Sequence, residues 1–594
     1  MNGAYPSDWR IRLVVFGILG CFLGIIGRLY YLHVLDRERL VSMIERSRTD
    51  VKVLPARRGA IYDVRGNVLA ATRSTVELGI DPHWMDPLDA KKIPSLANIT
   101  GVSTDELGRQ FERALGDKLL KRSEKGANVR WRKLAEGIDE ARYKEVMKLG
   151  ISGLYGNRTF QRFYPGKELA AHVVGFVNWE GLATIGLEKQ MDFYLRGQDG
   201  WRETERDGRR RELPHFRSRE VFPRDGLNLE TTIDSFVQHI VEEEIGILVK
   251  TYSPNAATII VSEPPTGRIV AMANTPTYDL NLFWKYPIGS HRNRALTDIF
   301  EPGSTFKIVT ASGVLNEGIV DPDTKVDCSI NAVRFQGKMV QLPVDDHPFD
   351  FLTVREIISK SSNRGAAQLG MLLGKKGLRR YASSFGFGEE TNIRLGGEVR
   401  GLLHPVSDWD GLTISRLPIG HAVGVTVLQI HFAMSVIANG GILMAPQLLR
   451  RVFDEVGNTV VRYEPKARRR VISEATAWTM REVLQKAVSP EGTASKAAIN
   501  GYDVAGKTGT ARKIVNGRYS PQHHIASFIG FFPARNPRFL ISVIIDEPEV
   551  RGVPYGGRIA APIFRSLAEN LIRYYGIKPE TRTKELYVWK EAID

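Results

Sequence analysis

The chain has 594 residues, of which 43% are hydrophobic and 25% charged, with a formal net charge of +15. This length predicts several domains, and the composition is that of a folded protein. The positive charge suits nucleic acid, anionic lipid or an acidic polymer, but no zinc-finger, RNP-like or basic heptad pattern occurs, so we expect no nucleic acid as a partner. The two cysteines, Cys21 and Cys328, lie far apart, and the histidines lack ligand spacing. We therefore expect neither an intramolecular disulfide nor a metal site.

The N-terminal segment is apolar enough to cross a membrane. Every residue between Arg12 and Arg28 is apolar, and apolar residues resume afterwards. We predict a cytoplasmic tail over residues 1–10 and one transmembrane helix over residues 11–32. A cleaved signal peptide is the alternative, but no small-residue cleavage site follows the run. Because a single span of this kind usually exports the larger part that follows it, we expect the bulk of the chain to lie outside the cytoplasm.

Four glycines mark one face of this predicted helix. Gly17, Gly20, Gly24 and Gly27 are spaced 3, 4 and 3 residues apart, which places them on one stripe. The spacing of Gly20 and Gly24 allows close approach of a second helix. The pattern predicts a helix-packing face, although glycine is also simply frequent in transmembrane helices.

Two further domains follow the membrane segment. Residues 50–232 are mixed and polar, with a strand–turn–strand pattern over residues 57–70, charged helical patterns to about residue 150, and a loop and helix over residues 181–200. Residues 233–576 are more apolar, and we treat residues 577–594 as a C-terminal tail. This division predicts an N-terminal pedestal or interaction module and a larger C-terminal domain.

The larger domain reads as an α+β fold. Asp234 precedes a helical pattern, and residues 256–274 form two apolar runs around a Pro-Pro-Thr-Gly turn, which indicates a hairpin. Three strand candidates occupy residues 503–512, 526–532 and 538–546, and a helical pattern follows. Strands at both ends with helices between them predict one antiparallel sheet shared by the first and last segments.

Ser304 and Lys307 lie three residues apart behind a Pro-Gly pair, at the start of an apolar run ending near Gly318. An ordinary helix start with a serine cap is one interpretation. The other is chemical, because residues i and i+3 share a helix face and a desolvated lysine can accept the proton of a serine hydroxyl.

Two further motifs could complete such a site. The segment Lys507, Thr508, Gly509 and Thr510 offers a positive charge, two hydroxyls and an open backbone, a set that suits a carboxylate. Ser-x-Asn occurs at residues 253–255, 329–331 and 361–363, and only the last copy ends a helical segment. Each motif alone is also typical of an ordinary strand end or helix end.

In chain order the three motifs are Ser304/Lys307, Ser361/Asn363 and Lys507–Gly509. In this order they resemble the active-site set of penicillin-binding proteins and serine β-lactamases. Residues 57–70 and 181–200 resemble the N-terminal boxes of class B penicillin-binding proteins. Residues 295–307 and 489–511 are closer to the division transpeptidases of the FtsI type than to the elongation enzymes. Two positions depart from the family pattern: Val64 stands where Arg is common, and Val427 stands where Pro is frequent.

The resemblance implies a transpeptidase fold and a peptidoglycan D,D-transpeptidase that cross-links stem peptides in septal wall synthesis without a cofactor. It also implies single-pass insertion in the inner (cytoplasmic) membrane, with the catalytic domain periplasmic or otherwise extracytoplasmic. Ser304 would be the nucleophile, and the residue that β-lactams acylate. Lys307 would be the base, and Ser361 a proton relay. Backbone N–H groups of Ser304 and Thr510 would form the oxyanion hole. Asn363 would hold the peptide, and Lys507, Thr508, Gly509 and Thr510 would bind the terminal carboxylate.

Several alternatives stay open at this point. An elongation-type transpeptidase, a β-lactamase or D,D-carboxypeptidase using water, and a catalytically silent scaffold share parts of the pattern. The family also implies partners: a SEDS-type glycosyltransferase (FtsW-like), which would pack on the glycine face of the membrane helix, and other division proteins. Self-dimerisation is the rival use of that face.

Overall fold

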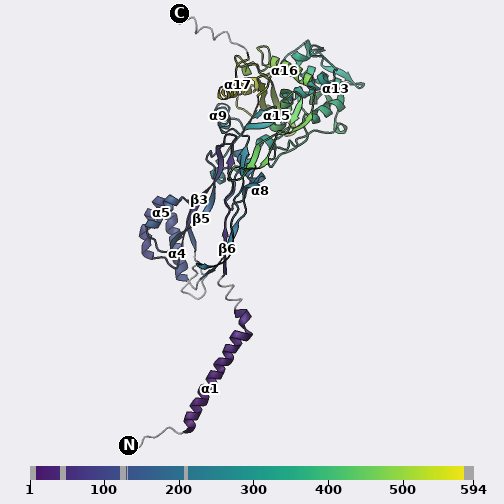
Figure 1. Ribbon diagram of the computed structural model, residues 1–594. Helices are drawn as coiled ribbons and strands as arrows, with labels where there is room; N and C mark the ends of the chain where they lie inside the picture. Colours follow the sequence, from purple (N-terminus) through teal and green to yellow (C-terminus); the bar gives the residue numbers. More distant parts are fainter. Residues whose placement is uncertain (1–7, 41–48, 121–128, 130, 207–211, 581–594) are drawn as a thin grey trace, which may run out of the picture. The chain divides into compact units, whose positions relative to one another are not determined.

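The computed structural model describes residues 8–40, 49–120, 129, 131–206 and 212–580 (Figure 1). The chain divides into two compact units, one made of residues 1–57 with 197–226, the other of residues 58–196 with 227–594. The expected tails over residues 1–10 and 577–594 therefore lie largely outside the described residues.

The first unit contains a long exposed helix and a small sheet. Helix α1 spans Asp8–Tyr30 and continues into a π-helical turn over Tyr31–Leu35. Within the described parts of the chain, Asp8–Leu35 is the one helix long and apolar enough to cross a membrane, and the predicted span lies inside it. The sheet is antiparallel, in the order β1 (Thr49–Leu54), β6 (Gly200–Arg206) and β7 (Glu212–Val221).

The second unit begins with a seven-stranded sheet. Strands β17 (Thr459–Arg462), β16 (Leu449–Phe453), β8 (Asn228–Thr231), β2 (Ile61–Tyr62), β3 (Val68–Ile80) and β4 (Arg132–Ile138) follow in that order, and β5 (Leu154–Phe163) also pairs with β3. The predicted strand–turn–strand over residues 57–70 is present as β2 and the start of β3. The sheet also recruits β16 and β17 from more than 200 residues downstream.

Three helices and β4 form a separate core beside β3 and β5. These helices are α3 (Ile93–Thr100), α4 (Thr104–Leu120) and α5 (Glu140–Lys148), and their apolar faces pack together with β4. The helical pattern predicted up to residue 150 is thus interrupted by a strand. Likewise, the helix predicted after a loop within residues 181–200 is divided into α7 (Gly186–Gln190) and α8 (Asp192–Leu195).

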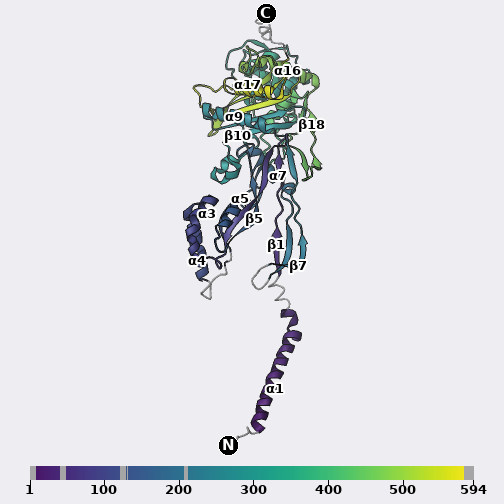
Figure 2. The ribbon, with the colours of Figure 1, turned by 60° about the vertical axis from the view of Figure 1, so that its left-hand side comes forward.

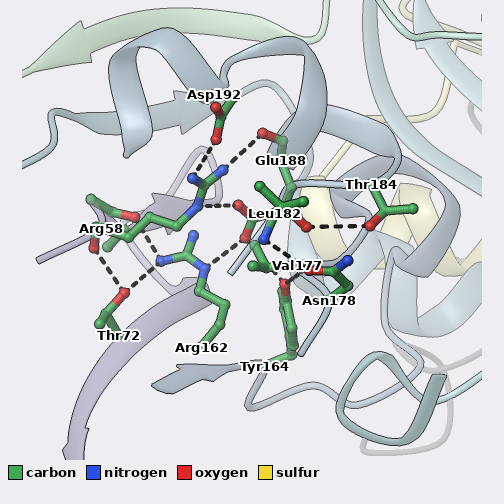
Figure 3. Close-up of polar contacts among 12 residues, drawn as sticks. Arg58, Thr72, Arg162, Tyr164, Val177, Asn178, Leu182, Thr184, Glu188 and Asp192 are labelled. Atoms are coloured by element: carbon green, nitrogen blue, oxygen red, sulfur yellow. Dashed lines mark hydrogen bonds and ion pairs between the residues drawn. The ribbon is translucent and has the colours of Figure 1, made fainter. Parts of the chain in front are cut away.

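A buried ion network ties this region together (Figure 3). Glu188 on α7 is fully buried and accepts from Arg58 Nε at 2.7 Å and from Arg162 Nε at 2.6 Å. Arg58 Nη1 also donates to Asp192 at 2.5 Å. Burial by itself would lower the pKa of Arg58, but the Glu188 and Asp192 carboxylates raise it above its usual value. We name Arg58, Arg162, Glu188 and Asp192 the paired cluster.

The predicted antiparallel sheet of the larger domain is confirmed. Its five strands are ordered β10 (Arg268–Thr275), β9 (Ala256–Glu263), β21 (Phe539–Asp546), β20 (Arg518–Phe532) and β19 (Ala505–Val515). The first and last segments of the domain therefore lie in one sheet, and β19 forms an edge.

Alternate strand residues face two cores. Ile259 and Val261 on β9 belong to a core covered by α9 (Ser235–Tyr252) and α17 (Gly556–Tyr575), which lie side by side (Figures 1 and 2). Ile260 between them belongs to the core on the opposite face. This alternation follows from the two-residue period of a strand. Asp234 caps α9, as its position predicts.

The remaining elements fill the opposite face or connect the layers. The helices are α6 (Ala171–Val174), α10 (Arg294–Thr297), α11 (Lys307–Asn316), α12 (Val354–Ser359), α13 (Asn363–Ser384), α14 (Thr413–Arg416), α15 (Val427–Ala438) and α16 (Glu474–Val488). The strands are β11 (Lys325–Asp327), β12 (Ala332–Phe335), β13 (Lys338–Gln341), β14 (Phe351–Thr353), β15 (Ile442–Met444) and β18 (Ala467–Arg470).

Candidate active site

Ser304 lies in a single 3₁₀ turn, Gly303–Phe306, that leads directly into α11. The turn begins after Pro302, so Ser304 is not the helix cap that the simpler interpretation of its motif required. Ser304 is half-buried, and Lys307, the first residue of α11, is completely buried. The helix ends at Asn316, just before Gly318, which has a left-handed φ of 64°.

The Ser361 motif sits in a tight turn between two helices. Helix α12 begins at a capping box formed by Thr353 and Glu356. After its last residues, Ser362 N donates to Ile357 O at 2.9 Å, which is the long bond of a Schellman motif. Ser361 thus occupies the left-handed position of that motif, with φ of 64°, where glycine is usual. A serine held there is strained, because a residue with a Cβ rarely adopts this conformation.

The Lys507 motif lies on the edge strand β19, next to the turn that carries Ser304. Gly509 is required there, because a Cβ would lie 3.2 Å from Pro302 O and only 2.3 Å from Ser527 Oγ. The Thr508 hydroxyl is 2.9 Å from that of Thr493, and Thr510 Oγ1 accepts from Gly556 N at 3.2 Å. The strand therefore packs against the segment Pro302–Thr305, which contains Ser304, and both threonine hydroxyls have partners within the protein.

The fold brings the three motifs together around Ser361. Lys307 Nζ donates to Ser361 O at 2.5 Å, to Ser361 Oγ at 3.2 Å and to Asn363 Oδ1 at 2.7 Å. Lys507 Nζ donates to the same Ser361 Oγ at 2.9 Å and to Thr508 O at 3.2 Å. Among the residues that the structure describes, Ser304 Oγ and Lys307 Nζ do not form a hydrogen bond with each other. We name Lys307 and Lys507 the lysine pair.

Burial weakens the hold of both lysines on their protons. The pKa of Lys307 falls to about 7, because desolvation outweighs the opposing charges of Asp345 and Asp346. Desolvation and the charge of Lys307 also hold the pKa of Lys507 well below its usual value. One of the two amines can therefore be neutral near pH 7 and accept a proton.

Two neighbours of the lysine pair escaped prediction as site residues. His421 is a neutral imidazole at neutral pH, since burial and the nearby Arg416, Lys307 and Arg512 lower its pKa to about 4. Asp345 lies in the loop before β14 and contacts the Ser361 turn. Neither residue has a spacing that marks it. A cavity of about 350 Å³ opens beside the site, between residues 299–301 and the far end of β19.

Two family models cover most of the chain. The penicillin binding protein transpeptidase domain matches residues 257–569, and the penicillin-binding protein dimerisation domain matches residues 53–231. The chain belongs to the class B penicillin-binding proteins. The three motifs that resemble the family in sequence are the ones that the fold of this penicillin-binding protein brings together at Ser361. Its activity is that of a serine-type peptidoglycan D,D-transpeptidase.

Relatives of this chain align with nearly its whole length. Stage V sporulation protein D of Bacillus subtilis is 30% identical over 98% of this chain and 88% of its own, and the peptidoglycan D,D-transpeptidase FtsI of Escherichia coli is 29% identical over 97% and 93%. The crystal structure of penicillin-binding protein 3 of Mycobacterium tuberculosis with aztreonam matches with a TM-score of 0.66 and 26% identity, over 89% of this chain and 98% of that one.

One departure from the family pattern has a local explanation. Val427, where the family often has proline, is the first residue of α15, and Thr426 and Gln429 form the capping box of that helix. Proline is favoured at the first helical position because its missing N–H is not needed there. In this chain valine occupies that first helical position, and the capping box formed by Thr426 and Gln429 is intact.

Proposed function

We propose that Ser304 is the nucleophile and Lys307 its general base in this transpeptidase. The observation that carries the proposal is the burial of Lys307 against neutral oxygen atoms of Ser361 and Asn363, which lets the amine exist unprotonated near pH 7. In acylation, Ser304 Oγ attacks the carbonyl of the penultimate D-Ala, and its proton passes to Lys307 Nζ. The backbone N–H groups of Ser304 and Thr510 stabilise the resulting oxyanion.

Ser361 then completes proton transfer. Its hydroxyl oxygen accepts from both lysines, so its own O–H is free to donate to the leaving amine. The peptide bond breaks, the terminal D-Ala departs with that proton, and the stem peptide stays on Ser304 as an ester. Lys307 Nζ passes the proton that it took from Ser304 to Ser361 Oγ, which restores the Ser361 hydroxyl and the neutral amine. The amine of a second stem peptide attacks this ester and forms the cross-link, and the bond from the carbonyl carbon to Ser304 Oγ breaks. The attacking amine loses one proton to Lys307, which passes a proton to Ser304 Oγ. Asn363 holds the peptide, while Lys507, Thr508, Gly509 and Thr510 bind the terminal carboxylate.

Covalent labelling by a fluorescent penicillin tests this assignment. Ser304→Ala should abolish labelling while leaving the melting temperature unchanged, because the substitution removes the only proposed nucleophile. Labelling that survives this change contradicts the assignment. The lifetime of the parent adduct separates the chemical alternatives: a stable adduct is expected of a transpeptidase, whereas rapid release would favour a β-lactamase.

We further propose that the enzyme serves division. Support comes from the segment Ala295–Lys307, which is closer to division transpeptidases, and from the relative named FtsI. A relative named for sporulation points to another use of the same chemistry. Depletion of this protein in a rod-shaped host should give filaments. Round cells would favour the elongation role. Cells of unchanged shape would favour a scaffold or sporulation role.

The membrane helix is proposed to anchor the enzyme in the inner membrane, with the catalytic domain outside the cytoplasm. A Cβ built on Gly17, Gly20, Gly24 or Gly27 meets no atom within 4 Å, so this stripe of α1 is open to a partner helix. We assign that partner as a SEDS-type glycosyltransferase (FtsW-like), which would supply glycan strands. We also propose that the N-terminal interaction domain spans residues 50–232 and that the transpeptidase domain spans residues 233–576.

Gly20→Leu with Gly24→Leu should weaken co-purification of that glycosyltransferase in detergent without changing penicillin labelling. Leu19→Ala with Leu23→Ala, on another face of α1, is the matched control. If the two double variants retain the partner equally well, the glycine stripe is not the interface. If the glycine double variant loses self-association but still co-purifies with the glycosyltransferase, the stripe is the interface of a homodimer.

A further inference from the structure

The Ser361–Asn363 turn is held from outside by the loop that precedes β14. Val344 O accepts from Asn363 Nδ2 at 2.8 Å. A carbonyl oxygen can only accept, so this bond fixes the orientation of the Asn363 amide and directs its Oδ1 to Lys307. The loop therefore determines which atom of Asn363 faces the lysine.

The next residue, Asp345, caps the helix that follows the turn. Its Oδ2 accepts from Ser362 Oγ at 2.9 Å, and its Oδ1 accepts from Asn363 N in a short hydrogen bond and from Arg364 N at 3.2 Å. Ser362 Oγ in turn accepts from Gly365 N at 3.0 Å. Together the two side chains satisfy the first backbone N–H groups of α13, which have no partner within the helix.

This arrangement bears directly on the strained residue. Ser361 is immediately before the capped segment and holds a left-handed φ of 64°. Such a conformation persists only where the surrounding structure enforces it. The Schellman bond fixes one side of the turn, and the Asp345 carboxylate fixes the other.

We propose that Asp345 is a positioning residue of the transpeptidase: its carboxylate holds the Ser361–Asn363 turn so that Ser361 Oγ lies between Lys307 and Lys507. Asp345 touches neither lysine through a hydrogen bond and acts through the turn. The inference rests on the roles of Ser304 and Lys307 proposed above.

The charge of Asp345 acts on the same site through space. It raises the pKa of Lys307 against the effect of burial, and Asp346 acts in the same direction. The other titratable groups that face Lys307 are Lys507 on β19 and His421 in the segment before α15. Removing one carboxylate charge should therefore lower the pKa of Lys307 and move the acidic limb of the acylation profile to lower pH.

The test measures the second-order rate of acylation by benzylpenicillin across pH. Asp345→Asn should lower the plateau rate by about 10–100-fold, the scale expected for a small displacement of catalytic groups, and should shift the acidic limb to lower pH. Asp345→Glu keeps the charge but moves the carboxylate, so its plateau should fall while its acidic limb stays in place.

Asp346→Asn is the matched control, because Asp346 contributes a similar charge, is exposed, and has no hydrogen bond to the turn among those of the described residues. It should shift the acidic limb without lowering the plateau. Equal plateaus for Asp345→Asn, Asp346→Asn and the parent overturn the proposal.

If Asp345→Asn does not fold, Ser362→Ala removes one contact of the carboxylate, and its plateau should fall several-fold; an unchanged plateau overturns the proposal. Ser304→Ala separates the two levels of inference. If labelling survives Ser304→Ala, the site assignment itself fails, whereas loss of labelling together with a normal Asp345→Asn plateau defeats only the role of Asp345.

Discussion

Two buried groups of charged side chains in this protein follow opposite rules. In the paired cluster, Arg58 and Arg162 both face carboxylates, and the carboxylates raise the pKa of Arg58. In the lysine pair, the hydrogen-bond acceptors are neutral oxygen atoms, and burial lowers the pKa of both amines. The first arrangement keeps its protons and fixes structure. The second keeps a proton only weakly, which a general base requires.

The largest effect is expected from breaking the paired cluster. Glu188→Gln removes the charge shared by Arg58 and Arg162, and leaving buried cations without that partner should cost about 3–5 kcal/mol of unfolding free energy. Chemical denaturation followed by circular dichroism measures this loss. Glu140→Gln is the matched control, since its ion pair with Arg158 is exposed and should leave the midpoint unchanged. Equal midpoints for both variants would show that the paired cluster contributes no stability.

Removing the proposed base, Lys307, from the lysine pair is expected to have the next largest effect. Lys307→Ala should slow penicillin acylation at least about 10²-fold, the lower range for loss of a general base. Lys307→Arg should be equally slow although it keeps the positive charge, because a guanidinium does not give up its proton in proteins. Stopped-flow acylation measures both variants. An Arg variant close to the parent would mean that the site needs charge and not a proton acceptor.

The pH dependence of acylation tests whether Lys307, unlike the arginines of the paired cluster, gives up its proton near pH 7. With the pKa of Lys307 at about 7, the neutral amine is the minor form at lower pH, so acylation should fall about tenfold per unit below pH 7 and level off above it. The lowered pKa also means that the unfolded chain binds more protons between pH 7 and the ordinary lysine range. Unfolding free energy should therefore rise with pH across that window, and the full penalty applies below pH 7. A rate that is flat down to pH 5 contradicts this assignment.

The smallest effect concerns the strained turn. Ser361→Gly relieves the left-handed backbone and should raise the unfolding free energy by about 1 kcal/mol, while acylation slows for want of the hydroxyl. Ser361→Ala loses the same hydroxyl but keeps the strain, so it should slow acylation without stabilising the fold. Thermal melts of the two variants, measured side by side, decide the point. If glycine is no more stable than alanine, the turn stores no strain.

The sequence by itself determined the features that depend on neighbouring residues. The cap of α9 at Asp234, the hairpin of β9 and β10, and the closing helix α17 follow from local spacing and turn chemistry, and all three are present. The three motifs could also be found from sequence, because a tight turn, a helix start and an edge strand each impose a short pattern.

Tertiary structure alone decided how these parts meet. Strand β4, the break between α7 and α8, and the pairing of β16 with β8 depend on partners far away in sequence, which no local period reports. Asp345 carries no motif, and only the packing of its loop against α13 brings its carboxylate to the turn. The lowered pKa of Lys307 likewise arises from desolvation. Burial is a property of the whole fold. The sequence could therefore place Lys307 three residues after Ser304, but only the packed structure lowers the pKa of Lys307 to about 7, as the proposed base role requires.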